Sequence, residues 1–192
     1  MTTDGRVARG ERTREAIVAA HTALLLEGEL KPTAKVIADR AGVSVRTLWA
    51  NFKDLEALLN ETTAYWMAAD DELRQPIDPS QPLDERISTF CAERARRLEN
   101  IAPAARSAVL GEPFSPTLKR SREAHIRRLR LEVETVFAQE IAADGSDDLK
   151  FALMAATGWP AWQALRDDYK LGPDEALAVM RRTISALLDS VG

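Results

Sequence analysis

The sequence predicts an all-α protein of nine helices, and three observations carry that prediction. Apolar residues recur at spacings of three and four along almost the whole chain, which is the period of an amphipathic helix. No stretch of useful length alternates apolar and polar residues as a half-buried strand would. Glycines and prolines separate the helical segments, most clearly at 75–82, where three prolines fall within eight residues.

The expected helices span 13–28, 33–42, 44–52, 54–74, 83–101, 103–111, 115–141, 148–172 and 173–192. Gly28 and Gly42 are suited to end the first two helices, because glycine adopts the left-handed conformation that follows a helix. Thr33 and Ser44 are suited to cap the starts of the second and third. Pro160 should bend the eighth helix, since proline lacks an N–H donor and crowds the preceding turn.

Composition excludes several classes of protein. The 192 residues are 45% hydrophobic and 29% charged, which is typical of a globular protein with a core. No apolar run approaches the ~20 residues of a membrane helix, and the polar N-terminus is no secretory signal. One cysteine, Cys91, and two distant histidines, His21 and His125, disfavour a disulfide or a metal site. We therefore expect a cytoplasmic protein without metal or cofactor and without a membrane partner.

Charge is distributed unevenly along the chain. Residues 1–53 hold nine Lys and Arg against six Asp and Glu, a net charge of +3. Residues 54–192 hold 17 against 24, a net charge of −7, and the two sum to the −4 of the whole chain. A basic head on an acidic body suggests that only the head approaches a polyanion, although so small an imbalance can also arise by chance.

The segments 33–42 and 44–52 together fit a helix-turn-helix. Ala38 and Ala41 are small enough for a second helix to cross closely, and Gly42 supplies the tight turn. Val43 fills the space between the two helices. Ser44 caps the second helix, whose positive N-terminal end favours nearby phosphates. The alternative is an ordinary helical hairpin with a glycine connection.

The second of these helices has an inner and an outer face. Leu48 and Phe52 lie one turn apart and should face the core together with Ile37. The residues left pointing outward are Arg46, Thr47, Trp49, Ala50 and Asn51. Arginine, threonine and asparagine can hydrogen-bond to bases or phosphates, and the tryptophan suits a phosphate–sugar contact. Val45 could either pack in the core or touch a thymine methyl group.

Further basic residues flank this helix. Lys35 on the preceding helix and Lys53 at its exit are candidates for phosphate contacts. Arg6, Arg9 and Arg12 could form an arm that follows the DNA backbone, or belong to a merely disordered tail, and residues 1–10 are expected to be a flexible basic arm. The sequence thus divides into this arm, a DNA-binding domain over 11–53, and a second domain over 54–192.

The stretch TAKVIADRAGVSVRTLWANFKDLEALL resembles the DNA-binding segment of TetR-type transcriptional regulators. The positions that match the usual pattern are Thr33, Ile37, Ala38, Ala41, Gly42, Val43, Ser44, Thr47, Leu48, Trp49 and Phe52. The match is strong over residues 12–60, about a quarter of the chain. The remainder resembles the family only as architecture, in which the last two helices correspond to a dimer-forming pair.

The resemblance implies roles for individual residues. Thr33 would cap its helix and touch a phosphate, and Trp49 would make the phosphate contact that Tyr or Phe usually makes. Lys35, Val45, Arg46 and Thr47 would face bases or backbone, and Asn51 stands where His is common. One position departs from the pattern: Leu55 lies where the family usually has a phosphate-binding lysine. Lys53 and the backbone amides near Asp54 are the candidates to replace that contact.

A homodimer and a ligand-binding domain are the remaining expectations. Two reading helices held by a two-fold axis would recognise a palindromic DNA operator. The expected dimer stripes are Ala155, Trp159, Trp162 and Leu165 on one helix and Val179, Ile184, Leu187 and Leu188 on the other. The alternative is that these residues pack only within the core of their own subunit. The resemblance implies a central cavity for a small molecule, with candidate lining residues Trp66, Phe90, Cys91, Arg94, Phe114, Leu118, His125 and Trp159.

Arg94 and His125 interrupt otherwise apolar stripes. A buried arginine needs a partner, which could be an anionic ligand or an internal carboxylate, and His125 could simply be a satisfied core residue. The run KRSREAHIRRLR is expected to be the solvated face of a long helix rather than a second nucleic-acid patch.

The sequence carries no motif of an enzyme. It lacks G-x-S-x-G, a phosphate-binding glycine loop, H-E-x-x-H and C-x-x-C, and the charges of ERARRLE point to several faces. We expect a ligand-responsive regulator, most simply a repressor released from its operator by a small-molecule effector. The alternative is an adaptor that binds DNA constitutively and has no such ligand.

Overall fold

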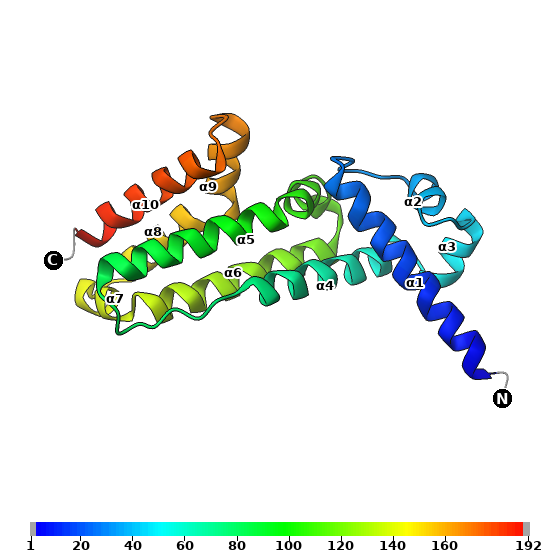
Figure 1. Ribbon diagram of the computed structural model, residues 1–192, viewed down its shortest axis with the longest axis horizontal. Helices are drawn as coiled ribbons and strands as arrows, with labels where there is room; N and C mark the ends of the chain where they lie inside the picture. Colours follow the sequence, from blue (N-terminus) through cyan, green and yellow to red (C-terminus); the bar gives the residue numbers. More distant parts are fainter. Residues whose placement is uncertain (1–2, 190–192) are drawn as a thin grey trace. The chain divides into compact units, whose positions relative to one another are not determined.

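The computed structural model describes residues 3–189, and the side chains of residues 7–189 (Figure 1). This part of the chain is all-α and contains no strand, as the sequence predicts. Its helices are α1 (Thr3–Leu26), α2 (Ala34–Arg40), α3 (Val45–Asn51), α4 (Leu55–Leu73), α5 (Leu83–Gly111), α6 (Pro116–Val136), α7 (Ala138–Asp144), α8 (Asp148–Thr157), α9 (Trp159–Gln163) and α10 (Pro173–Asp189). None of these described helices is long and apolar enough to span a membrane.

The described chain forms two compact units. The first contains the residues up to Asp71 together with Ile101–Ser121, and the second contains Glu72–Asn100 together with Arg122 and the residues after it. Helices α4, α5 and α6 therefore each pass from one unit into the other. The expected boundary between residues 53 and 54 lies at the start of α4, whereas the first unit extends along most of that helix.

The described residues form ten α-helices where the sequence predicts nine, because three boundaries differ. The expected break at Pro103 is wrong, since α5 runs through this proline with the buried residues Ile101 and Ala102 before it. The long helix expected over 115–141 instead ends at Val136, and α7 follows. Gly158 is extended, so Pro160 lies in the first turn of a new helix, α9, where a missing N–H costs no hydrogen bond.

A buried ion pair accompanies the break between α6 and α7. Arg86 of α5 donates to the Val136 carbonyl at the end of α6, at 2.6 Å, and to both carboxylate oxygens of Glu140 on α7, at 2.6 and 3.0 Å. The hydrogen bonds from Arg86 hold the pKa of the Glu140 carboxyl below its usual range. A terminal helix carbonyl needs such a donor, so this arginine stabilises a helix break that helical periodicity alone does not predict.

The start of the chain also differs from expectation. Residues 3–10, expected as a flexible arm, form the first turns of α1. The helix continues here because no proline interrupts it, and Arg12 and Thr13 hydrogen-bond to the carbonyls of Ala8 and Arg9 one turn earlier. The side chain of the predicted arm residue Arg6 lies outside the described residues.

The first unit holds a three-helix head packed on the start of α4. Helices α1, α2 and α3 contact one another in every pair. Their shared core consists of Ile17, Leu24, Ile37, Ala38, Leu48, Phe52 and Leu58. The last of these belongs to α4, so the fourth helix completes the core of the head rather than merely following it.

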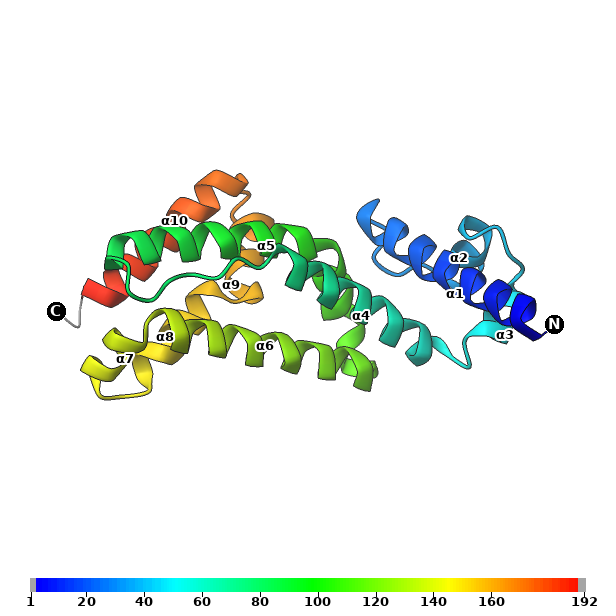
Figure 2. The same cartoon turned by 60° about the horizontal axis from the view of Figure 1, so that its bottom comes forward.

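The second unit is built around α8 and α10, which pack against each other, together with α7, α9 and parts of α5 and α6 (Figures 1 and 2). Phe90 and Phe137 meet edge to face with ring centroids 5.1 Å apart. Trp162 is fully buried and donates to Glu99 at 2.7 Å. Glu99 also accepts from Arg166 at 2.8 Å, which fixes the turn that follows α9.

The head contains one buried histidine. His21 of α1 is almost fully buried, and its Nδ1 lies 3.0 Å from the hydroxyl of Thr62 on α4. That hydroxyl donates to the Leu58 carbonyl at 3.0 Å, so it accepts from a neutral His21. Burial lowers the pKa of His21 from 6.5 to about 4.

We predict that acid weakens the fold through His21. Below about pH 6.5 the unfolded chain takes up a proton that the folded chain does not bind until about pH 4, so the free energy of unfolding should fall by about 2 kcal/mol between about pH 7 and pH 5. Urea unfolding of the protein and of His21→Gln at both pH values measures this difference. The variant should lose most of the pH dependence, and equal pH dependence in the two proteins would contradict the assignment.

Candidate functional site

The turn between α2 and α3 has the geometry that its sequence predicts. Gly42 has a φ of +69°, and the Val43 N–H donates to the Ala38 carbonyl at 3.0 Å, which closes the end of α2. The Ser44 hydroxyl accepts from the Thr47 N–H at 3.0 Å and caps α3. Thr33 caps α2 in the same way through the Val36 N–H. These caps fix where both helices start and how sharply the chain turns between them.

The two faces of α3 are also as predicted. Leu48 and Phe52 are fully buried and pack with Ile37 of α2. On the outer face Trp49 is 40% exposed, and Val45 is exposed as well, so the valine is not a core residue. Arg46 is exposed, as is Lys53 just after the helix. The exposed face of α3 therefore combines a guanidinium group, an indole and an aliphatic side chain, and α3 itself contains no acidic residue.

Other predicted contact residues are engaged within the head itself. Asn51 is half-buried and donates from Nδ2 to the Thr47 carbonyl at 2.8 Å. The Thr47 hydroxyl lies 2.8 Å from that of Ser44. Lys35 forms an exposed ion pair with Asp39 at 2.5 Å, which a phosphate could replace. The predicted contact residues that are exposed and have no described polar partner are therefore Val45, Arg46, Trp49 and Lys53.

The position that departs from the family pattern is a surface residue. Leu55, which stands where the TetR-type pattern has a lysine, lies in the first turn of α4 and is 51% exposed. Asp54 caps this helix by accepting from the Ala57 N–H at 2.8 Å. Lys53 is thus the exposed cation closest in sequence to the start of α4.

Arg14 is a residue of the head that the sequence analysis did not select. Its guanidinium donates to the Asn51 carbonyl at the end of α3 and to Glu61 of α4. It also lies over the Phe52 ring, 4.4 Å from the ring centroid. One side chain of α1 therefore fixes the end of α3 to α4. The only signal in the sequence is its place three residues before the buried Ile17.

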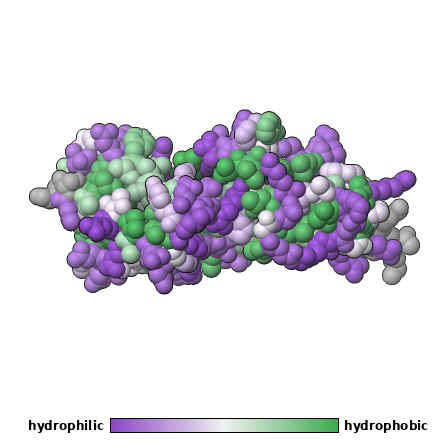
Figure 3. Space-filling model, turned by 90° about the horizontal axis from the view of Figure 1, so that it is seen from above, coloured by the Kyte–Doolittle hydropathy of each residue, from purple (hydrophilic) through white to green (hydrophobic). Residues whose placement is uncertain are grey.

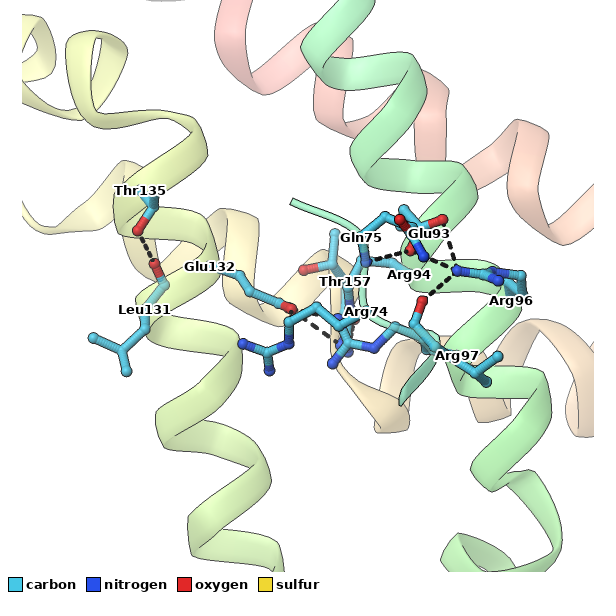
Figure 4. Close-up of polar contacts among 11 residues, drawn as sticks. Arg74, Gln75, Glu93, Arg94, Arg96, Arg97, Leu131, Glu132, Thr135 and Thr157 are labelled. Atoms are coloured by element: carbon cyan, nitrogen blue, oxygen red, sulfur yellow. Dashed lines mark hydrogen bonds and ion pairs between the residues drawn. The ribbon is translucent and has the colours of Figure 1, made fainter. Parts of the chain in front are cut away.

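A second candidate site is a cavity of about 220 Å³ inside the second unit. Helices α5 and α6 and the segment that follows α4 provide its walls (Figure 4). The lining residues are Arg74, Gln75, Pro76, Ile77, Phe90, Glu93, Arg94, Arg97, Leu131, Glu132, Thr135 and Val136. It combines an apolar wall with a group of ionised side chains, which is the usual composition of a small-molecule site.

Glu132 stands among three arginines of this cavity. Arg97 donates to its Oε1, the Arg74 Nε lies 3.4 Å from the same oxygen, and the Arg94 Nη1 lies 3.6 Å from Oε2. Arg94 also donates to the Thr157 carbonyl from Nε at 3.3 Å and from Nη2 at 3.0 Å. An internal carboxylate thus partners Arg94, one of the two alternatives that the sequence left open.

The predicted ligand-binding residues are divided between the two units. Phe90 and Arg94 line the cavity. Cys91 is buried but does not line the cavity, and burial raises the pKa of its thiol to about 12, so the thiol stays protonated. His125 and Trp159 belong to the same unit but do not line the cavity.

Three more of the predicted lining residues, Trp66, Leu118 and Phe114, belong to the first unit. The last of them is 87% exposed, so it lines no cavity among the described residues. Arg74, Arg97 and Glu132 line the cavity although the sequence did not single them out. The spacing of three between Arg94 and Arg97 was the available signal, since residues three apart on a helix share a face.

Comparisons with known proteins agree with this architecture. The chain is similar to the crystal structure of a transcriptional regulator from Rhodococcus sp. Rha1, with a TM-score of 0.64 over 94% of this chain and 96% of that one. The two sequences are 17% identical. A protein described as a TetR-family transcriptional regulator from Mesorhizobium loti MAFF303099 is 18% identical, with a TM-score of 0.62 over 95% and 98%. Neither a family model nor a curated protein sequence matches the chain. The likeness shows that the chain has the fold of TetR-type regulators.

We predict that Arg14 fixes the end of α3. Arg14→Gln should lower the free energy of unfolding by about 1–3 kcal/mol, because it leaves Glu61 and the Asn51 carbonyl without their charged donor. Hydrogen–deuterium exchange should rise first at the amides of α3. Arg12→Gln is the matched control, since Arg12 is exposed and bonds only within its own helix. Equal protection of α3 in both variants would contradict this role.

Proposed function

We propose that this protein is a transcriptional regulator that binds double-stranded DNA through α3. The single observation that carries the proposal is the exposed face of a helix fixed by Ser44 and Gly42 in helix-turn-helix geometry. The folds of two transcriptional regulators support it. The basic residues of the head favour a polyanionic partner, and the rest of the chain is acidic.

Within this proposal each exposed group has a distinct task. Arg46 and Val45 lie near the start of α3, the end that a recognition helix places against base edges. Arg46 suits a guanine edge or a phosphate, and the valine suits a thymine methyl group. Trp49 offers its indole N–H to a phosphate, and Lys53 offers a point charge. The capped N-terminus of α3 adds a positive partial charge on the same side.

A homodimer is part of the same proposal, because a single reading head contacts only a few base pairs. Of the residues expected on the dimer stripes, Trp162, Ile184 and Leu188 are buried in the subunit's own core, whereas Val179 of α10 is 41% exposed. Phe151 of α8, which the sequence did not place on a stripe, is 49% exposed. Hydrophobic surface gathers beside the C-terminal end of α10 (Figure 3). This exposed face is our candidate for the two-fold interface.

A small-molecule effector would act through helices that belong to both units. Glu56 of α4 accepts from the Thr117 N–H at the start of α6, at 3.0 Å, and Glu61 of the same α4 holds Arg14. A ligand that prefers one arrangement of α4 would thereby change how the two copies of α3 are presented, at a coupling of about 1–3 kcal/mol. Release from the operator would make the protein a cytoplasmic repressor. Binding to DNA that no ligand alters would instead make it an adaptor.

We predict that selection from random DNA duplexes enriches a palindrome. Arg46→Ala and Trp49→Ala should each weaken binding to the selected duplex by about tenfold or more, because each removes a contact from the reading face. Arg127→Ala is the control, since Arg127 is an exposed cation of α6 in the second unit and should leave affinity unchanged. Fluorescence anisotropy measures all three. Unchanged affinity in both α3 variants would refute the assignment of α3.

We also predict that the exposed face of α8 and α10 joins two copies. Phe151→Glu combined with Val179→Glu should convert a dimer to a monomer, because four carboxylates would enter an apolar contact. Sedimentation velocity gives the oligomeric state. Phe114→Glu is the matched control, because it changes an equally apolar exposed residue in the first unit. A wild-type monomer, or a dimer that survives the double substitution, would exclude this interface.

A further inference from the structure

The ionised side chains around the 220 Å³ cavity are unequal in sign. Three arginines line it, Arg74, Arg94 and Arg97, against the two glutamates Glu93 and Glu132. Glu93 is held by a neighbour outside the lining set, since Arg96 donates to both of its carboxylate oxygens at 2.9 and 2.8 Å. One carboxylate, Glu132, thus stands directly among the three guanidinium groups.

The two carboxylate oxygens of Glu132 differ in their contacts with these guanidinium groups. Its Oε1 accepts from Arg97 and lies 3.4 Å from the Arg74 Nε. Its Oε2 is buried, accepts no hydrogen bond from a described residue, and lies 3.6 Å from the Arg94 Nη1. A guanidinium group can bind a carboxylate in a planar, two-bonded pair at about 2.8 Å, so Arg94 and Arg74 are placed near a carboxylate without that ideal geometry.

The other lining residues are mostly apolar. The apolar side chains are Pro76, Ile77, Phe90, Leu131 and Val136, and the polar ones are Gln75 and Thr135. The volume of about 220 Å³ equals the liquid share of about seven water molecules, which suits an organic molecule on the order of ten non-hydrogen atoms. A small organic molecule with one charged end and an apolar body therefore fits both the charged and the apolar part of the wall.

We propose that this cavity binds a small organic acid, whose carboxylate is held by Arg74 and Arg94 beside Glu132. Only the statement that this acid is the effector rests on the proposed function. Glu132 acts as the internal anion that keeps the arginines in place and competes with the ligand for them. The ligand's apolar body lies against Phe90 and Leu131.

Arg94 connects this ligand to the helices proposed for the dimer. Its guanidinium donates to the carbonyl of Thr157, the last residue of α8, next to the extended Gly158. An acid that draws Arg94 toward itself changes the support of this helix end. Because α8 packs against α10, a change at the cavity reaches the elements that present the exposed apolar face.

Calorimetric titration of the full chain tests the proposal with defined probes. The acids are hexanoate and benzoate, the neutral analogues are hexanamide and benzamide, the cation is hexylamine, and the inorganic anion is phosphate. We expect saturable binding of at least one acid below about 10 mM and none of its amide. Binding of the amide as tightly as the acid, or of hexylamine or phosphate instead of the acids, would overturn the assignment, as would no binding of either acid.

Two substitutions should move affinity for the acid in opposite directions. Arg74→Gln should weaken it about tenfold, because a charged donor is lost, and Arg74 is exposed enough to be replaced without a buried void. Glu132→Gln should strengthen it about tenfold, because the competing anion is gone while the shape remains. Arg130→Gln, an exposed change on the same α6, is the control.

If Glu132→Gln does not fold, judged by circular dichroism, Arg74→Gln carries the test alone. Equal affinity of Arg74→Gln and the unchanged protein would overturn the proposal. Measuring the duplex affinity with and without the acid separates the two claims. If the acid binds but leaves DNA affinity unaltered, the cavity is an acid-binding site and the acid is not the effector. If the protein binds DNA but no acid, the acid-binding site is excluded and the proposed DNA-binding function stands.

Discussion

The guanidinium of Arg14 holds three elements of the head in one arrangement. It donates to the last residue of α3 and to Glu61 on α4, and it covers the ring of Phe52 between them. A helix of only seven residues such as α3 has little stability of its own, so its orientation depends on what it packs against. The Ser44 cap fixes the start of α3, and Arg14 fixes its end. Every proposed contact with DNA assumes that both ends stay in place.

The second unit faces a different constraint, because it encloses arginines. A buried cation is costly unless it is paired and hydrogen-bonded. Arg86 meets this need with Glu140 and the carbonyl at the end of α6. Arg94 meets it with the carbonyl at the end of α8 and with Glu132. In both places the same bonds that offset burial also close a helix end, so the cluster and the helix boundaries depend on each other.

Local features of the fold could be predicted from the sequence, and distant ones could not. Thr33, Gly42 and Ser44 act through hydrogen bonds within a few residues, so their residue types reveal them. Arg14 and Glu61 are 47 residues apart, and nothing in their spacing links them. The continuation of α5 through Pro103 likewise depends on tertiary packing, which overrides the local preference of proline.

The same division applies to the candidate sites. The inner and outer faces of α3 follow from helical periodicity, although the bonds of Asn51 and Thr47 to their own helix do not. In the second unit periodicity singled out Arg94 and Phe90, because both lie on the striped face of α5. Glu132 and Arg74 come from other segments, and only the folded chain brings them to that face. The expected lining residues Trp66, Leu118 and Phe114 belong to the other unit, which no periodicity could indicate.

We propose that two copies of α3 read the major groove of one DNA duplex. Dimethyl sulfate footprinting tests it directly, because this reagent methylates guanine N7, which faces the major groove. On a duplex selected by the protein, the account predicts two clusters of protected guanines. Their centres should lie about 34–36 Å apart, or at a multiple of that helical repeat. A single protected cluster, or tight binding without any protection of guanine N7, would contradict the account.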